Sequence, residues 1–394
     1  MTEQKQEERQ EQEKQQGLKE QFDLIFHPGT PFGPVRISAG LVTQALALGP
    51  LAGLVGAWSG TGFNTIWRPN DSNAIINGGP NPNHSDHFLQ LNLTTETLNF
   101  TAIPGPVPNR GLLQPDINLF GLHYLQQINS RGFRASNGVN VVPQAIHLEP
   151  GLWMNVIATS DPADPPGVVR IGSIPHGNAF LAQGTAVTTP GAPEIDPVSP
   201  APGVNGITPF RPGFPNQPFP FPEQNLANDG PTSVSSSQPL DPGITQEMVD
   251  DPNSILRDDI VGQNIISTTT LSISTTRAGS GVENIPFLGT ANPGNQFQPT
   301  EANAFVQQMT ATFWLETVRA RLRIPVPIPF PGGEPGSRPA GNGIAREVID
   351  LIQPEWSPDS LTFLQLQYSQ TVLLNFNGLL WPHVSVATLT LGSG

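Results

Sequence analysis

The chain contains no cysteine among its 394 residues. Disulfide bonds, thiolate nucleophiles, thiolate-bound metals and iron–sulfur clusters are therefore excluded. Several catalytic signatures are also missing. The sequence has no G-x-S-x-G nucleophile elbow, no G-x-x-x-x-G-K-[ST] phosphate loop and no H-E-x-x-H zinc motif. Enzyme classes that depend on these motifs are excluded with them.

Positive charge is scarce. The chain has 18 lysines and arginines against 32 aspartates and glutamates, a formal net charge of -14, and the basic residues form no cluster. A protein with this balance repels a phosphate backbone unless it gathers its basic residues on one surface. We therefore expect no nucleic-acid partner.

Long hydrophobic runs are missing too. The most apolar stretch, residues 41–58, is interrupted by Gln44, Pro50 and three glycines, whereas a membrane-spanning helix needs about 20 consecutive apolar residues. The first 21 residues have no apolar core of the kind that secretory signals carry. Because the lack of cysteine also fits a reducing compartment, we expect a cytoplasmic protein without a membrane span.

Glycine and proline are abundant instead. The 40 glycines and 44 prolines make up about a fifth of the chain, against about 12% in average proteins. A length of 394 residues suits about two or three domains, but so much glycine and proline indicates large loops around fewer domains. Residues 1–20 are mostly Glu, Gln, Lys and Arg and have no apolar face to bury, so they predict a charged, disordered tail.

Short runs with alternating polarity or many β-branched residues predict strands along the rest of the chain. In the clearest run, 87–94, the alternation places Leu89, Leu91 and Leu93 on one face. We also predict a first strand that begins near Gly56 and a helix at 346–352. The other predicted strands are 119–128, 141–148 and 152–159 (joined by a turn at Glu149-Pro150-Gly151), 168–174, 265–273, 309–318, and 361–374 and 383–391 (separated by an Asn377-Gly378 turn).

Two proline-rich stretches interrupt this pattern. Residues 190–242 interleave 14 prolines with phenylalanines that could pack over another surface, and residues 324–341 are a second such stretch. A strand ladder does not tolerate this density of proline. Because strands lie on both sides of 190–242 and neither half looks complete, the sequence predicts a mainly β fold: a single antiparallel β-barrel over 38–394 with long Pro/Gly-rich loop insertions.

The seven histidines are the remaining candidates for ligands or acid–base groups. His84-Ser85-Asp86-His87 could present two imidazoles and a carboxylate to a metal, but polar residues are ordinary in such a loop. His123 and Tyr124 are adjacent in a predicted strand, so they point to opposite faces. His147 and His176 lie in or just after strands, and each is more often structural than a ligand.

Both ends of the barrel region resemble the nitrobindin family, haem-binding relatives of the fatty-acid-binding (calycin) barrels. Gly56, Trp58, Gly60 and Gly62 match the family's opening G-x-W-x-G-x-G. Near the other end are its L-x-Y (Leu366, Tyr368) and its last-strand histidine (His383), followed by Ala387, displaced by one position, and Leu389. Gly151-Leu-Trp-Met154 and Ile174-Pro-His-Gly177 are similar to segments of a related set of haem-binding-like barrels. The two proline-rich stretches have no counterpart in the nitrobindins.

The resemblance implies a calycin-type barrel that binds haem b or another apolar ligand in its lumen. It places the proximal haem histidine, the iron ligand, at His383. Trp58, Trp153 and Met154 are our candidates for the apolar wall, and no single one of His123, His147 and His176 stands out as a distal group. It also implies weak peroxidase or peroxynitrite-isomerase activity, for which the residues themselves offer no catalytic group. Two alternatives stay open. One is a lipid or small-molecule carrier without iron, with Arg68 or Arg170 holding a carboxylate; the other is a structural protein that uses its Pro/Phe-rich loops for assembly.

Overall fold

The computed structural model describes residues 46–69, 75–76, 79–80, 87–111, 116–135, 138–160, 163–174, 177–203, 206–215, 226, 240–284, 305–321, 360–376 and 379–392. The predicted tail 1–20, the loop 324–341, the helix 346–352 and the Asn377-Gly378 turn lie outside these residues. The chain divides into two units, one of residues 1–36 and 317–363 and the other of residues 37–316 and 364–394. In the first unit, the described residues are the end of one long strand and the beginning of the next.

Most of the described chain is β-strand. The barrel strands are β1 (Gly56–Pro69), β4 (His87–Ala102), β6 (Ile117–Ser130), β9 (Gln144–Val156), β12 (Gly167–Ile174), β13 (Asn178–Pro190), β14 (Asn264–Ser274), β16 (Phe305–Arg321), β17 (Ser360–Phe376) and β18 (Leu379–Leu391). Shorter strands are β2 (Ile75–Ile76), β3 (Gly79–Pro80), β5 (Val107–Asn109), β7 (Phe133–Arg134), β8 (Asn140–Val141), β10 (Thr159–Ser160), β11 (Ala163–Asp164) and β15 (Gly281–Asn284). The helices are η1 (Gly49–Leu54), α3 (Gln246–Asp250) and α4 (Ser254–Asp259), and no helix in the described part of the chain is long and apolar enough to cross a membrane.

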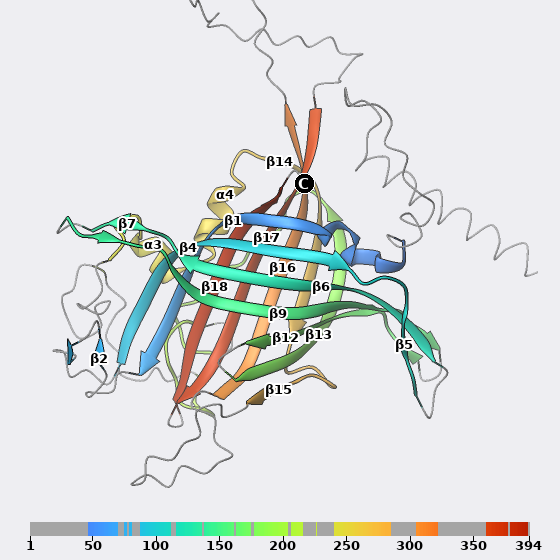
Figure 1. Cartoon of the computed structure of the whole chain (residues 1–394), viewed down its shortest axis with the longest axis horizontal. Coiled ribbons are helices and arrows are strands. Elements are labelled where there is room, and N and C mark those ends of the chain that lie inside the picture. The colour runs from blue at the N-terminus through green and yellow to red at the C-terminus, as the bar shows by residue number, and fades with distance from the viewer. Residues whose placement is uncertain are drawn as a thin grey trace, which may run out of the picture. The chain divides into compact units, whose positions relative to one another are not determined.

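Ten antiparallel strands close into a barrel. Their order is β12-β9-β6-β4-β1-β18-β17-β16-β14-β13, and pairing of β12 with β13 closes the ring (Figure 1). The pairing of β1 with β18 joins the two ends of the barrel region, with Trp58 opposite Leu391 and Ile66 opposite His383. The predicted single antiparallel barrel is confirmed.

Close packing between strands explains the glycines of the first strand. A Cβ atom added at Gly60 would lie 2.0 Å from the Thr388 carbonyl oxygen, and one added at Gly62 would lie 2.2 Å from that of Val386. Gly56 has a φ of 135°, which favours glycine. These glycines thus permit the close approach of β1 to β18.

The structure differs from the sequence prediction in two segments. Residues 144–156 form one strand, β9, and not two strands joined by a turn at Glu149-Pro150-Gly151. Pro150 is tolerated because β12 pairs with β9 only from Gly151 onward, so the missing N–H breaks no bond on that side. Gly151 is needed because an added Cβ would meet the Tyr124 ring at 2.5 Å. Strand β13 was not predicted, since small residues (Ala182, Gly184, Ala186) fill its inward positions and weaken the hydrophobic pattern.

One end of the barrel interior is tightly packed. Trp58 is 1% exposed, and its indole Nε1 donates to the Leu54 carbonyl oxygen at 2.7 Å. Leu51 and Leu54 of η1 belong to the same buried cluster, together with Trp153, Phe313 and Leu389. Helix η1 and Trp58 thus close this end of the barrel interior.

The described part of the proline-rich insertion packs outside the barrel. Ile195, Val198 and Ile207 share a buried cluster with the outward side chains of β1, β4 and β18, and Trp67 donates to the Ile207 carbonyl oxygen at 2.7 Å. Phe210 is buried against Leu373 and Leu380, as expected for a phenylalanine that covers another surface, whereas Phe214 is 55% exposed. Phe219 and Phe221 lie outside the described residues.

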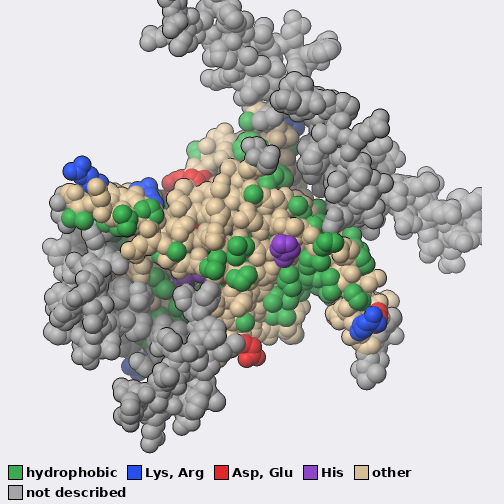
Figure 2. All heavy atoms as spheres, in the orientation of Figure 1, with side chains coloured by type: hydrophobic (Ala, Val, Ile, Leu, Met, Phe, Trp, Pro, Cys, Tyr) green, Lys and Arg blue, Asp and Glu red, His purple; other side chains and the backbone are tan. Residues whose placement is uncertain are grey.

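Hydrophobicity does not separate the inner and outer faces of this barrel. On β4, Leu89, Leu91 and Leu93 face outward into the cluster beneath the insertion, while the buried Thr94 and Glu96 face inward. On the other side, Leu125, Leu148 and Ile171 of β6, β9 and β12 are 37–40% exposed. Figure 2 shows scattered apolar side chains and few charged ones on that face. Polar side chains that could form a binding site are therefore to be sought among the inward-facing residues of the strands.

Candidate functional site

The half of the barrel lumen away from Trp58 contains a cavity of about 380 Å³. This volume falls in the usual range of small-molecule sites, about 300–1,000 Å³. The inward positions of eight barrel strands, together with Ile146 and Val306, line it, which is why its residues are scattered along the sequence. They are Asn64, Ile66, Gln90, Asn92, Gln126, Ile128, Ile146, His147, Ile174, Asn178, Val306, Tyr368, Gln370, Val372, Leu374, His383 and Ser385.

The cavity wall combines apolar and neutral polar groups. Seven lining residues are Ile, Val or Leu, and six are Asn or Gln. Asp, Glu, Lys and Arg do not occur among the described lining residues. Asn178 is 6% exposed, and its Oδ1 has no hydrogen-bond partner. A buried acceptor without a partner is costly, so this wall is suited to a neutral ligand that donates a hydrogen bond.

His383 lies in a small polar cluster on this wall. Asn64 Nδ2 donates to Ser385 Oγ at 2.8 Å and also to His383 Nε2, and Asn92 Nδ2 donates to Asn64 Oδ1 at 3.3 Å. Because Asn64 donates to it, Nε2 of His383 is the unprotonated nitrogen of the ring, a tautomer assigned from the hydrogen-bond network. The lone pair that a metal would use is engaged by an amide.

His147 lines the same cavity, four strands around the barrel from His383. Its Nε2 is 3.3 Å from Glu149 Oε2, and the imidazole side chain is 14% exposed. Since an ionised carboxylate only accepts, His147 Nε2 carries the proton in this pair. The cavity thus has two imidazoles in different hydrogen-bonding states.

A buried ion pair lies in the interior next to the cavity. Arg170 Nη2 is 2.6 Å from Glu149 Oε1, and both side chains are at most 2% exposed. Arg170 also donates to Tyr124 Oη at 3.0 Å and to Gln370 Oε1 at 2.8 Å. Four aromatic rings, those of Tyr124, Trp153, Phe180 and Phe313, have centroids 5.1–5.9 Å from its guanidinium carbon, within the range of cation–π attraction.

The ion pair controls how Glu149 titrates. Burial by itself raises the pKa of Glu149, but the Arg170 charge and the bonds from His147 and Tyr124 outweigh burial and lower it to about 2. Burial by itself lowers the pKa of Arg170, but Glu149 and Tyr124 outweigh burial and raise it above its ordinary value, so Arg170 stays charged. Glu149 is therefore a permanent anion beside His147 at neutral pH.

A second buried carboxyl, Glu96, behaves in the opposite way. Tyr368 Oη donates to Glu96 Oε2 at 2.6 Å and Thr94 Oγ1 to Oε1 at 3.0 Å. Burial raises the pKa of Glu96 to about 7, and the hydrogen bonds and the nearby His147 only reduce this rise, because no described arginine or lysine is paired with it as Arg170 is with Glu149. Tyr368 lines the cavity, so a group that titrates near neutrality is one hydrogen bond away from it.

The four residues assigned to a ligand site from the sequence are not brought together. His383 lines the cavity, but Trp58, Trp153 and Met154 are not among its described lining residues. Trp58 and Trp153 are 1% exposed in the packed cluster, where Trp153 stacks edge-on against Phe313 with ring centroids 5.3 Å apart. Met154 is the next residue along β9 from the inward Trp153, so it lies on the opposite face of the strand.

Of the other histidines considered from the sequence, one lines the cavity, one is on the outer surface and the side chains of the rest are not described. His123 is exposed, and Tyr124 beside it points inward, as the alternation predicted. His147 is the suggested distal residue that the structure places at the cavity. The side chains of His84, His87 and His176 lie outside the described residues, so the structure says nothing about the suggested metal loop.

Arg170 is inside the barrel, as the carrier interpretation required, but it is already paired with Glu149. A fatty-acid carboxylate would have to displace that glutamate, so this arginine does not support a carboxylate clamp. The side chain of Arg68 lies outside the described residues.

Sequence reasoning missed most of the polar lining. Asn64, Gln126, Asn178 and Gln370 belong to no motif, and Glu149 was placed in a turn. The sequence offered one signal of a polar lining, the alternation of Gln90 and Asn92 with Leu89, Leu91 and Leu93. One face of that strand had to line the lumen, and it could be the polar face. Comparisons of the chain with protein-family models, with curated proteins and with solved structures found no match.

Proposed function

We propose that this protein binds a small, neutral organic ligand in the lumen of its barrel. The ligand has an apolar body, which faces the Ile, Val and Leu side chains, and several hydrogen-bonding groups for the amides. The observation that carries the proposal is Asn178 Oδ1, a buried acceptor without a partner on the wall of a 380 Å³ cavity.

The lining argues against two other ligand classes. A strongly charged ligand would lose its hydration without gaining an opposite charge, because the described lining has none. A purely hydrocarbon ligand would leave the buried Asn178 Oδ1 without a hydrogen-bond partner. A ligand with both kinds of surface avoids both penalties.

Filling the cavity tests the proposal. We expect Val372→Trp to abolish binding of the neutral dye Nile red by the full chain, since Val372 lines the lumen. Leu125→Trp is the matched control, because Leu125 is on the outer face and 37% exposed, and it should bind dye as the unsubstituted protein does. Equal loss in both variants, or none in either, would contradict a lumen site. Organic extraction and mass spectrometry of the isolated protein would then identify its natural ligand.

Haem b is the second candidate, favoured by the imidazoles of His383 and His147 on one cavity. Haem needs an axial ligand and an apolar wall; His383 would supply the first and the aliphatic side chains, such as Ile128, part of the second. The fit requires one change, since coordination through His383 Nε2 displaces the Asn64 amide. When bound, the group would supply redox chemistry and reactions with small oxidants.

The Asn64 contact makes the haem candidate testable by two opposite substitutions. We expect His383→Ala to weaken or shift the Soret band of haemin-reconstituted protein, and Asn64→Ala to strengthen haem binding, because it removes the amide that donates to Nε2 and leaves only the longer 3.2 Å contact with Ser385 Oγ. His123→Ala, on the outer face, is the control. An unaltered spectrum in His383→Ala would show that His383 is not the axial ligand, and would leave the proposal of a neutral organic ligand intact.

A further inference from the structure

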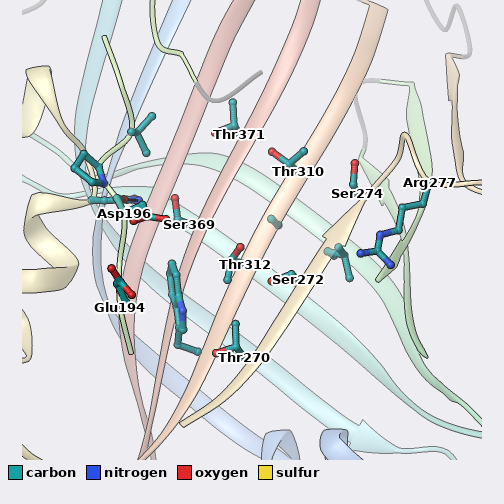
Figure 3. A pocket seen from close by; sticks show the side chains of 16 residues that line it. Glu194, Asp196, Thr270, Ser272, Ser274, Arg277, Thr310, Thr312, Ser369 and Thr371 are labelled. Atoms are coloured by element: carbon teal, nitrogen blue, oxygen red, sulfur yellow. Dashed lines mark hydrogen bonds between the residues drawn. The ribbon is translucent and has the colours of Figure 1, made fainter. Parts of the chain in front are cut away.

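A second cavity, of about 530 Å³, lies on the outside of the barrel. It is a groove between the outward faces of β14, β16 and β17 and the segment 194–198 of the proline-rich insertion (Figure 3). None of its described lining residues also lines the lumen cavity. The groove is therefore a separate site.

The floor of the groove is a regular array of hydroxyl groups. Thr270, Ser272 and Ser274 are alternate residues of β14, and Thr310 and Thr312 alternate on β16. Ser369 and Thr371 continue the array on β17. Alternate residues of a strand share one face about 7 Å apart, and neighbouring strands are about 4.8 Å apart, so the hydroxyls form a two-dimensional lattice, whose side chains Figure 3 shows over adjacent strands.

Hydrogen-bond acceptors gather at one end of this array. Figure 3 shows the carboxylates of Glu194 and Asp196 beside Ser369, with Arg277 at the far end. Asn253 lines the same groove and is 5% exposed. Its Nδ2 donates to the Asp196 carbonyl oxygen at 2.7 Å, whereas its Oδ1 has no hydrogen-bond partner. This end is short of donors.

These features select a class of ligand. An apolar molecule would cover the hydroxyl groups without forming hydrogen bonds to them. A phosphate group would be repelled by the two carboxylates. An extended peptide would seek free backbone groups, but β14, β16 and β17 are each paired on both sides within the barrel. A ligand with many hydroxyl groups both donates and accepts, so it can bond the Ser and Thr hydroxyls, the carboxylates and the Asn253 Oδ1 acceptor of the groove.

We infer that the groove is a binding site for a saccharide. Vicinal sugar hydroxyls donate to Asn253 Oδ1 and to the carboxylates at one end, and the Ser and Thr hydroxyls bond the rest of the molecule. The inference does not depend on the proposed lumen function.

Titration of the full chain with maltotriose, cellotriose and triacetylchitotriose tests the inference, with saturation-transfer NMR and calorimetry as readouts. We expect at least one probe to bind. Thr312→Val keeps the side-chain shape but removes one hydroxyl, so it should weaken binding about fivefold or more, the effect of one hydrogen bond. Ser369→Ala is a second variant in case Thr312→Val unfolds.

Two controls separate the groove from other surfaces. Thr188→Val makes the same change on β13, where the hydroxyl bonds Thr269 outside the groove, and should leave binding unchanged. Val372→Trp, which fills the lumen, should also leave it unchanged. Failure of all three saccharides to bind at millimolar concentration, or equal weakening in Thr312→Val and Thr188→Val, would overturn the inference.

Discussion

Glu149 and Arg170 form an ion pair of 2.6 Å in the barrel interior, where neither side chain is more than 2% exposed. They lie 21 residues apart on the neighbouring strands β9 and β12. The pair links the cavity, through His147 and Gln370, to the aromatic side of the core. Because the pair is buried, each charge is stabilised mainly by the other.

Breaking this pair should destabilise the fold strongly. Arg170→Met leaves a buried, uncompensated carboxylate, which typically costs about 3–5 kcal/mol. The double variant Glu149→Gln/Arg170→Met removes both charges, so we expect it to be more stable than Arg170→Met alone. Urea unfolding of the two single variants and the double variant measures the coupling, and additive losses would contradict a mutually dependent pair.

Stability should fall as pH rises through the near-neutral range. Burial raises the folded-state pKa of Glu96 and that of Glu316 to about 7, from an ordinary value of 4.5. Between these values the folded protein binds more protons than the unfolded chain, so each group contributes stability that is complete below pH 4.5 and is lost up to pH 7. The slope is about 1.4 kcal/mol per pH unit for each group. Glu96→Gln should remove one such slope in unfolding measured from pH 4.5 to 7.

Glu149 should act at the other end of the pH scale. Its folded-state pKa of about 2 lies below its ordinary 4.5, so its contribution is present above pH 4.5 and is lost as pH falls toward 2. Glu149→Gln should therefore have a flatter stability profile than the unsubstituted protein between pH 4.5 and 2. Equal slopes in the two proteins over this range would contradict the ion pair as the source.

Trp58→Ala should be a stability defect and not a binding defect. The side chain is 1% exposed, and truncation of a buried tryptophan costs about 3–5 kcal/mol. Nile red binding at the other end of the lumen should persist at a temperature where the variant is folded. A variant that keeps its melting temperature but loses dye binding would show that Trp58 contacts the ligand.

Gly62→Ala should weaken the pairing of β1 with β18. The new Cβ would lie 2.2 Å from the Val386 carbonyl oxygen and 2.8 Å from the Ala387 Cβ. Gly281→Ala is the matched control, because nothing lies within 4 Å of a Cβ at that position. Thermal unfolding should show a lower melting temperature for Gly62→Ala only.

The sequence alone determined the class of fold. Alternation in runs such as 87–94 identified the strands, and proline density identified the insertion. Gly56, Trp58 and Gly62 near one end of the barrel region and His383 near the other carried the resemblance to a calycin-type barrel, and the structure pairs the two strands that contain them, β1 and β18. These signals are local, because strand propensity and turn chemistry depend on neighbouring residues.

Only the tertiary structure decided where the polar chemistry lies. Alternation divides a strand into two faces but does not say which one is inside, and in this barrel Leu89 and Leu91 face outward while Glu96 faces inward. Asn64, Asn178 and His383 come together because β1, β13 and β18 curve around one lumen. The groove depends likewise on the segment 194–198 lying across β14, β16 and β17, which begin 66 or more residues later in the sequence. Such long-range arrangements follow from barrel closure, which no local pattern encodes.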